Sequence, residues 1–438
     1  MFDCACVRRA GACCTLDSPV RNNDQGTLVG NDSRTAERLL DRLRWRVVLV
    51  CVVAQNCAMG LAFGSFGPLL ASTEQHFGVP RAAAATGMSM ITLAIGGLSP
   101  FLGGMQQRVS VRTGMALGAL LSAIGYWGLA FTGSFHVALA MFGLIGVGVC
   151  LTAILGPLIL VSRWFESKRG KVLGIVNLPI LLFLTPYIVA ETLPRYGRCV
   201  LLSAMGTICA ALVAVLMLLV EHPPASARAA DVAAAQGEEA APIMKRPAFW
   251  LLSLGIGIVA GAGTGFVVHI VPFGVSRQMS LQSASALLSV YAGAGVGGTA
   301  LFGWICDRIG PPAALVVSTF CQALLWWSFL YVDGTALYVL AALLGICVVP
   351  LVTLHGAAIS QMFDTASVSR AMGYSYSIKL PFIFGFAPAL GLMFDRFGHY
   401  DVPFLITAAL LAVAGLFFYV MLLTLHRRKS SLAVVAAS

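Results

Sequence analysis

The chain has 438 residues, of which 58% are hydrophobic and 11% are charged, and its mean hydropathy is +0.87. Soluble domains are about 45–50% apolar and about 25% charged. The 28 basic and 18 acidic side chains are too few to cover the surface of a soluble protein of this length. The composition therefore excludes soluble globular and disordered proteins and predicts an integral membrane protein.

Residues 1–45 are polar and lack the apolar core of a signal peptide. We expect them to form a disordered cytoplasmic tail, or to result from a start codon assigned too early. The tail contains four cysteines, Cys4, Cys6, Cys13 and Cys14. No histidine lies near them and their spacing matches no standard zinc pattern. We therefore predict no metal site here and no cofactor.

Twelve apolar stretches follow, each long enough to cross a hydrocarbon core as a helix of about 20 residues. They run over residues 46–71, 82–104, 112–132, 135–162, 171–190, 199–220, 247–273, 282–305, 312–332, 335–362, 371–393 and 402–425. Polar and apolar residues do not alternate strictly along these stretches, which are also too long to be the strands of a barrel. Because lipid offers no partner to unpaired backbone groups, we predict an all-α membrane protein with twelve transmembrane helices.

The Lys and Arg residues predict the orientation, because basic residues accumulate on the cytoplasmic side of a membrane. With the N-terminus inside, cytoplasmic segments hold 22 of the 28 basic residues and the outer loops hold five. The remaining one, Lys379, lies within a predicted span. We expect both termini in the cytoplasm and a location in a cell membrane, the bacterial inner membrane. The net charge of +10 then reflects topology, so no nucleic-acid partner is expected.

The longest loop, residues 221–246, is rich in alanine, proline and charge and divides the spans into two sets of six. A weak repeat relates the two sets: Gly103-x-x-x-Gln107-Arg108 aligns with Gly303-x-x-x-Asp307-Arg308, each after the second span of its set. We expect two pseudo-symmetric halves related by an axis along the membrane normal. The predicted domains are the tail 1–45, a half 46–220, a cytoplasmic linker 221–246, a half 247–425 and a cytoplasmic tail 426–438.

Three motifs resemble a known family of transporters. Residues 303–310, GWICDRIG, are similar to the cytoplasmic G-x-x-x-D-R-x-G signature of the major facilitator superfamily. Residues 163–174, RWFESKRGKVLG, resemble the R-W-F…R-G…G run of its monocarboxylate transporter and oxalate/formate antiporter branch, and residues 63–69 resemble the first span of that branch. The resemblance covers residues 46–425 and implies a two-half transporter fold.

The sequence departs from the family pattern in two places. The first copy of the signature has Gln107 and Ser110 where the superfamily has Asp and Gly. The branch also commonly carries a cation or an Asp/Arg pair in span 8, whereas residues 291–298 are glycine-rich and no charge precedes Asp307.

The resemblance implies a cytoplasmic gate in which Asp307 pairs with basic groups or helix N-termini across the two halves. The alternative is a solvated charge pair that contributes little. The basic loop that contains Arg163 and Arg169 either forms gating contacts or anchors the protein to anionic lipid. The complete set of predicted gating residues is Gly303, Asp307, Arg308, Gly310, Arg163 and Arg169.

Lys379 is the strongest candidate for a substrate-binding residue. It lies near the bilayer midplane, where an ionised lysine costs about 2.5–3.5 kcal/mol, and none of the 18 acidic residues falls in the middle of a span. An anionic substrate would supply the missing charge; a shifted pKa and a side chain extended toward the interface are the alternatives. Its position also resembles that of the carboxylate-binding lysine of the oxalate/formate branch. Ser375 and Tyr376 share its helical face.

Other polar groups lie within the spans. For the amides of Gln55, Asn56 and Asn177, substrate binding and bonding between helices are equally open. His269, toward the outer side, and His355, toward the cytoplasmic side, are the candidate proton-coupling residues. A histidine that only bonds neighbouring helices is the alternative.

These observations favour a secondary transporter of small organic anions, mono- or dicarboxylates, that works by alternating access. The transport would be exchange or proton-coupled symport by a monomer in contact with membrane lipid. One alternative is an efflux pump for hydrophobic drugs or metabolites, although such pumps usually use a buried acid. A more distant alternative is a non-transporting membrane sensor. The sequence contains no hydrolase or ATPase motif, so we do not expect an enzyme.

Overall fold

The computed structural model of the chain describes residues 41–165, 169–219, 243–363 and 365–437. The chain divides into two units, Met1–Trp45 and Arg46–Ser438, and apart from the first residues of the helix that begins at Asp41, the helices described below belong to the second. The first 40 residues of the expected tail, with its four cysteines, lie outside the described residues. So does the expected linker up to residue 242.

The described residues are almost entirely helical and contain no strand. In the first half a helix (Asp41–Gly64) contains a π-helical turn, η1 (Asn56–Gly60), and ends with α2 (Leu61–Gly64). It is followed by α3 (Phe66–Phe77), α4 (Arg81–Arg108), α5 (Val111–Phe131), α6 (Phe135–Val149), the π-helical turn η2 (Cys150–Leu155), α7 (Gly156–Trp164), α8 (Arg169–Val176) and α9 (Ile180–Met217).

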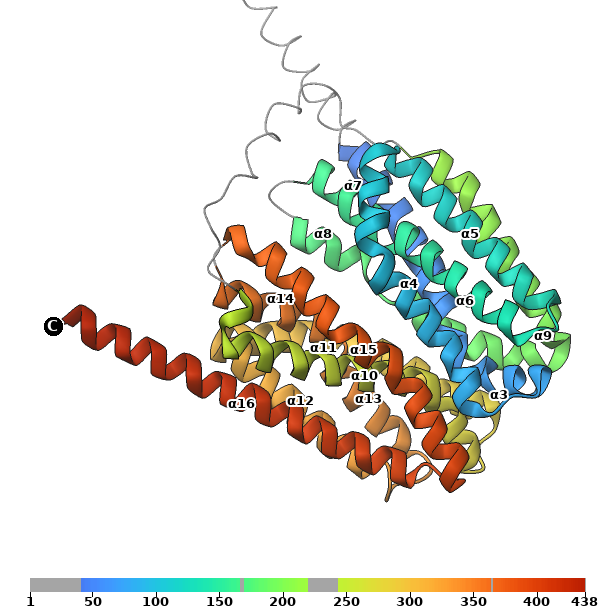
Figure 1. Ribbon diagram of the computed structural model, residues 1–438. Helices are drawn as coiled ribbons and strands as arrows, with labels where there is room; N and C mark the ends of the chain where they lie inside the picture. Colours follow the sequence, from blue (N-terminus) through green and yellow to red (C-terminus); the bar gives the residue numbers. More distant parts are fainter. Residues whose placement is uncertain (1–40, 166–168, 220–242, 364, 438) are drawn as a thin grey trace, which may run out of the picture. The chain divides into compact units, whose positions relative to one another are not determined.

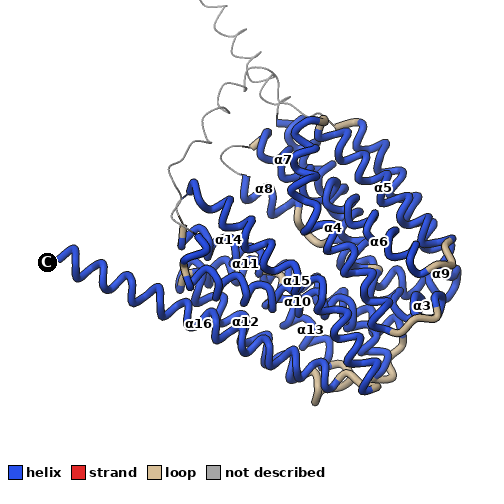
Figure 2. Tube along the Cα trace, viewed as in Figure 1, coloured by secondary structure: helices blue, strands red, loops and turns tan. Residues whose placement is uncertain are grey.

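The second half begins with a short 3₁₀ turn, η4 (Ile243–Lys245), ahead of the long helices. The helices are α10 (Pro247–Ser276), α11 (Leu281–Ile309), α12 (Pro311–Ser328), α13 (Ala336–Val348), α14 (Leu351–Met362), α15 (Thr365–Phe397) and α16 (Asp401–Ala437). Figures 1 and 2 show these helices along the chain.

Ten helices of the described chain are long and apolar enough to cross a membrane. One of them, Val172–Met217, has 46 residues, which is about 70 Å of helix at 1.5 Å per residue and too long for a core of about 30 Å. Gly197 interrupts it with a φ of 76°. The expected count of twelve spans is reached only if α9 crosses the membrane twice and α12 crosses it once.

The helix ends follow from local chemistry. Ser110 and Ser280 accept hydrogen bonds from the backbone N–H groups of Thr113 and Ser283, which caps α5 and α11. Gly310 lies between α11 and α12 with φ 84° and ψ 156°, a conformation open to glycine alone. The last glycine of the predicted signature thus makes the reversal between these two helices.

The two halves contact each other mainly through α4 with α15, α9 with α11, and α3 with α10. Figure 1 shows α4 and α15 side by side. We call the end at which α4 begins and α15 ends the Arg81 side, and the opposite end, where α7 and α14 finish, the Trp164 side. The positive-inside distribution predicts that the Trp164 side is cytoplasmic.

The contact between α4 and α15 is close from the Arg81 side to about the middle of both helices. The carboxylate of Asp395 accepts from the first N–H groups of α4. Deeper in the bilayer Ser89 donates to the carbonyl oxygen of Phe384, and a Cβ built at Gly96 would come within 2.6 Å of Leu380. Beyond this point Phe101 of α4 is 76% exposed. The halves are therefore packed on the Arg81 side.

Candidate functional site

Lys379 lies in the middle of α15, one residue before Leu380, which packs against Gly96 of α4. Its ammonium nitrogen lies 3.4 Å from the centroid of the Tyr376 ring. In the part of the chain that the structure describes, Lys379 forms no ion pair with a carboxylate. A cation–π contact contributes about 2 kcal/mol when it is desolvated, and it leaves the ammonium charge without a carboxylate partner.

His355 of α14 joins this group from another helix. Its Nε2 atom lies 2.9 Å from Oγ of Ser375, and its ring centroid lies 5.9 Å from that of Tyr376. The histidine is only 1% exposed, whereas Tyr376 is 41% exposed. The structure thus brings together four of the sequence-predicted residues, Ser375, Tyr376, Lys379 and His355, which we call the Lys379 cluster.

The side-chain amide of Asn56 makes two hydrogen bonds with the backbone. Its Nδ2 group donates to the carbonyl oxygen of Val52 at 3.0 Å, and its Oδ1 atom accepts from the N–H of Leu181 at 2.9 Å. The second bond joins the first helix to the start of α9. Gln55, beside it, is buried, and its Oε1 atom has no hydrogen-bond partner among the described residues.

Asn177 lies in a break of the fifth span, between α8 and α9. Its side chain is exposed, and its Nδ2 group donates to the carbonyl oxygen of Leu173, one turn earlier. Pro179, which ends the break, cannot donate a backbone hydrogen bond. Asn177 therefore stabilises its own turn, and none of its contacts reaches the Lys379 cluster.

Among the described residues, no ion pair joins the predicted gating residues Asp307, Arg308 or Arg163 across the two halves. Asp307 and Arg308 are exposed, and the guanidinium carbon of Arg308 lies 4.0 Å from the centroid of Trp304 on its own helix. Among the described residues, neither Asp307 nor Arg163 forms an ion pair. The side chain of Arg169 lies outside the described part.

His269 lies on the opposite side of the protein from His355. It is fully buried in α10, with Nδ1 3.1 Å from the hydroxyl of Tyr400 and Nε2 2.8 Å from the carbonyl oxygen of Ala387. Tyr400 in turn accepts from Arg81. This group could not be predicted from the sequence, because Arg81 and Asp395 lie at span ends, where charged residues are common.

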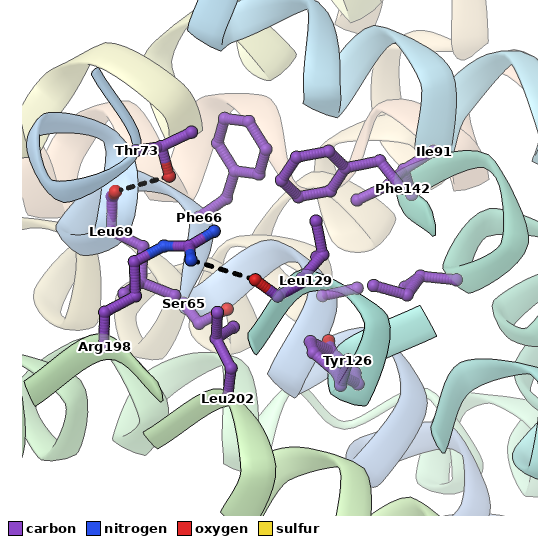
Figure 3. A pocket seen from close by; sticks show the side chains of 12 residues that line it. Ser65, Phe66, Leu69, Thr73, Ile91, Tyr126, Leu129, Phe142, Arg198 and Leu202 are labelled. Atoms are coloured by element: carbon purple, nitrogen blue, oxygen red, sulfur yellow. Dashed lines mark hydrogen bonds between the residues drawn. The ribbon is translucent and has the colours of Figure 1, made fainter. Parts of the chain in front are cut away.

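A separate cavity of about 20 Å³ lies within the first half (Figure 3). Its lining includes the buried hydroxyl of Tyr126, for which the described residues offer no partner, and Arg198, which donates to the carbonyl oxygen of Leu129 at 2.9 Å. This volume is enough for about one water molecule. No member of the Lys379 cluster lines the cavity, so it is distinct from the candidate substrate site.

Comparisons with known proteins agree with this architecture. The Major Facilitator Superfamily matches residues 52–339. The uncharacterized MFS-type transporter YcxA of Bacillus subtilis (strain 168) is 24% identical over 407 residues, which cover 86% of this chain and 94% of that protein. Monocarboxylate transporter 11 of Homo sapiens is 27% identical over 357 residues, covering 78% of this chain and 70% of that protein.

Solved structures show the same fold at low sequence identity. The nucleoside transporter NupG has a TM-score of 0.70 and 16% identity, and the match covers 87% of this chain and 99% of NupG. The xylose transporter XylE from E. coli, in a partially occluded inward open conformation, has a TM-score of 0.68 and 13% identity over 86% of this chain and 97% of XylE. The predicted all-α membrane fold is confirmed, and the chain is a transporter that belongs to the Major Facilitator Superfamily.

Proposed function

We propose that this transporter carries small organic anions, mono- or dicarboxylates, and that Lys379 binds the substrate carboxylate. The observation that carries the proposal is a lysine in the middle of a membrane-spanning helix whose ammonium lies over an aromatic ring and has no carboxylate partner among the described residues. The name of monocarboxylate transporter 11 agrees with a carboxylate substrate. The nucleoside and xylose transporters share the fold, which does not determine the substrate.

The charge of Lys379 also explains how binding would promote transport. A charge-assisted hydrogen bond contributes about 1.5–3 kcal/mol, which is comparable to the cost of an ionised lysine in the bilayer. The carboxylate would neutralise the ammonium and the loaded protein would change conformation more readily than the empty one. Exchange of one anion for another is the expected result.

His355 provides a route to proton coupling in the same cluster. A protonated His355 would bring a second positive charge close to Tyr376 and Lys379, which is unfavourable until an anion neutralises the lysine. Proton binding and anion binding would then assist each other, as linkage requires. We assign proton coupling to His355 and not to His269, because His269 does not contact the Lys379 cluster.

Counterflow in proteoliposomes tests the substrate assignment. A panel of labelled mono- and dicarboxylates is offered to wild type, to Lys379→Met, which removes the charge and keeps the length, and to Lys245→Met. Lys245 is an exposed lysine of η4 and serves as the matched control. We expect the Lys379 variant to lose at least about 10-fold in uptake of the transported anion, and the control to be unchanged. Undiminished uptake by Lys379→Met would contradict the assignment.

The coupling assignment has its own test. His355→Gln should keep anion exchange at symmetric pH and lose accumulation driven by an inward proton gradient, because glutamine retains a polar group but does not titrate. His136→Gln, at an exposed position, is the control. Gradient-driven accumulation by His355→Gln at the wild-type level would contradict coupling through His355.

A further inference from the structure

The Arg81 side contains a group of contacts that joins the two halves. The two carboxylate oxygens of Asp395, on α15, accept from the backbone N–H groups of Arg81 and Ala82 at 3.1 and 2.9 Å. These N–H groups open α4 and have no acceptor within that helix. A carboxylate is also favoured at this end by the helix dipole. Asp395 of one half therefore caps a helix of the other.

The side chain of Arg81 fixes the start of α4 in this position. Its guanidinium donates to both carboxylate oxygens of Glu74 at 2.8 and 3.2 Å, so its charge is paired within the first half. Its guanidinium carbon lies 4.0 Å from the centroid of the Phe394 ring, and it donates to the hydroxyl of Tyr400 at 3.2 Å. Both of these partners belong to the second half.

Tyr400 and His269 connect this group to the interior of the second half. Tyr400 is 2% exposed and His269 is fully buried. The hydroxyl of Tyr400 lies 3.1 Å from Nδ1 of His269, whose Nε2 atom is bonded to the carbonyl oxygen of Ala387 on α15. Gly391 permits the close approach, because a Cβ there would lie 2.7 Å from the Cα of Ala82.

We propose that Asp395 and Arg81 are positioning residues of the transport cycle, which hold the Arg81 side closed while the Trp164 side is open. The two sides differ in their polar contacts. Every polar contact of the group crosses between the halves or supports one that does, whereas the predicted gating residues Asp307 and Arg163 have no ion-pair partner in the described chain. Opening of the Arg81 side must break the cap of Asp395 on α4, and water then replaces it.

The cap also predicts the effect of a conservative substitution of Asp395. An asparagine keeps one acceptor oxygen and loses the negative charge, so Asp395→Asn should weaken the cap without removing the side chain. The equilibrium should shift by about 10-fold toward the state that is open on the Arg81 side, since charge-assisted bonds contribute about twice as much as neutral ones. Transport would change as a result, although no substrate contacts Asp395 in this account.

Hydrogen–deuterium exchange of the substrate-free, full-length protein in lipid nanodiscs tests the proposal. In Asp395→Asn we expect faster exchange at the start of α4 together with slower exchange in α14 on the Trp164 side, because that side closes as the other opens. Tyr400→Phe should move both signals in the same directions. Asp395→Glu, which restores the charge, should return both toward wild type.

Asp333→Asn is the matched control, since Asp333 is an exposed carboxylate that pairs with Arg277 within the second half. It should leave both signals unchanged. Faster exchange at the start of α4 alone would show that Asp395 only caps that helix. Unchanged exchange in both helices would show that Asp395 does not hold the two halves together. Either result overturns the proposal. The measurement involves no substrate, so a failed carboxylate assignment would leave it unaffected.

Discussion

Replacing Asn56 by alanine should weaken the fold and leave substrate affinity intact. The side chain makes two hydrogen bonds, to Val52 in its own helix and from the N–H of Leu181 at the start of α9. The second bond gives an acceptor to the N–H of Leu181, which lies in the first turn of α9 and has no acceptor within that helix. Its loss leaves that N–H without a partner, which costs about 1–3 kcal/mol.

The free energy of unfolding in mixed detergent and SDS micelles measures this loss. Asn56→Asp retains the acceptor oxygen and should lie between wild type and alanine. Asn177→Ala is the control, because Asn177 is exposed and bonds only to Leu173 in its own turn; it should cost less than about 0.5 kcal/mol. If Asn56→Ala has wild-type stability and a raised KM for the transported anion, Asn56 binds substrate and the structural reasoning is wrong.

Two glycine substitutions test the backbone geometry in the same unfolding assay. Gly310→Ala should destabilise the protein by about 1–3 kcal/mol, because the backbone conformation of Gly310 is open to glycine alone. Gly303→Ala is the control and should be neutral or slightly stabilising, because a Cβ at this position would meet no other atom. Equal effects of the two substitutions would contradict the conformation assigned to Gly310. Gly391→Ala should cost about 1–3 kcal/mol by overpacking against Ala82, and should also speed exchange at the start of α4. Gly385→Ala on the same helix meets open space and should do neither.

The spans could be predicted because their signal is local. A long apolar segment must be a helix in lipid, and the predicted span 282–305 lies within the observed α11 (Leu281–Ile309). The break at Gly197 lies between the predicted fifth and sixth spans. The shared face of Ser375, Tyr376 and Lys379 also follows from helical spacing alone.

The remaining contacts depend on distances between helices, which one sequence does not contain. His355 precedes Ser375 by 20 residues on another helix, and nothing in its local sequence distinguishes it from His269. The amide of Asn56 could not be assigned until Leu181, 125 residues away, was found to donate to it. Asp395 was missed for a related reason: a carboxylate at a span end is common, and its partners on α4 lie more than 300 residues earlier.

The central claim is that the charge of Lys379 binds the carboxylate of the substrate. It is tested most directly by the dissociation constant of the transported anion for the purified protein, compared between wild type and Lys379→Met, with the uncharged amide of the same compound as a second ligand. We predict that the variant binds the anion about 10- to 100-fold more weakly and that the amide binds both proteins equally. Equal affinity of both proteins for the anion would contradict the claim.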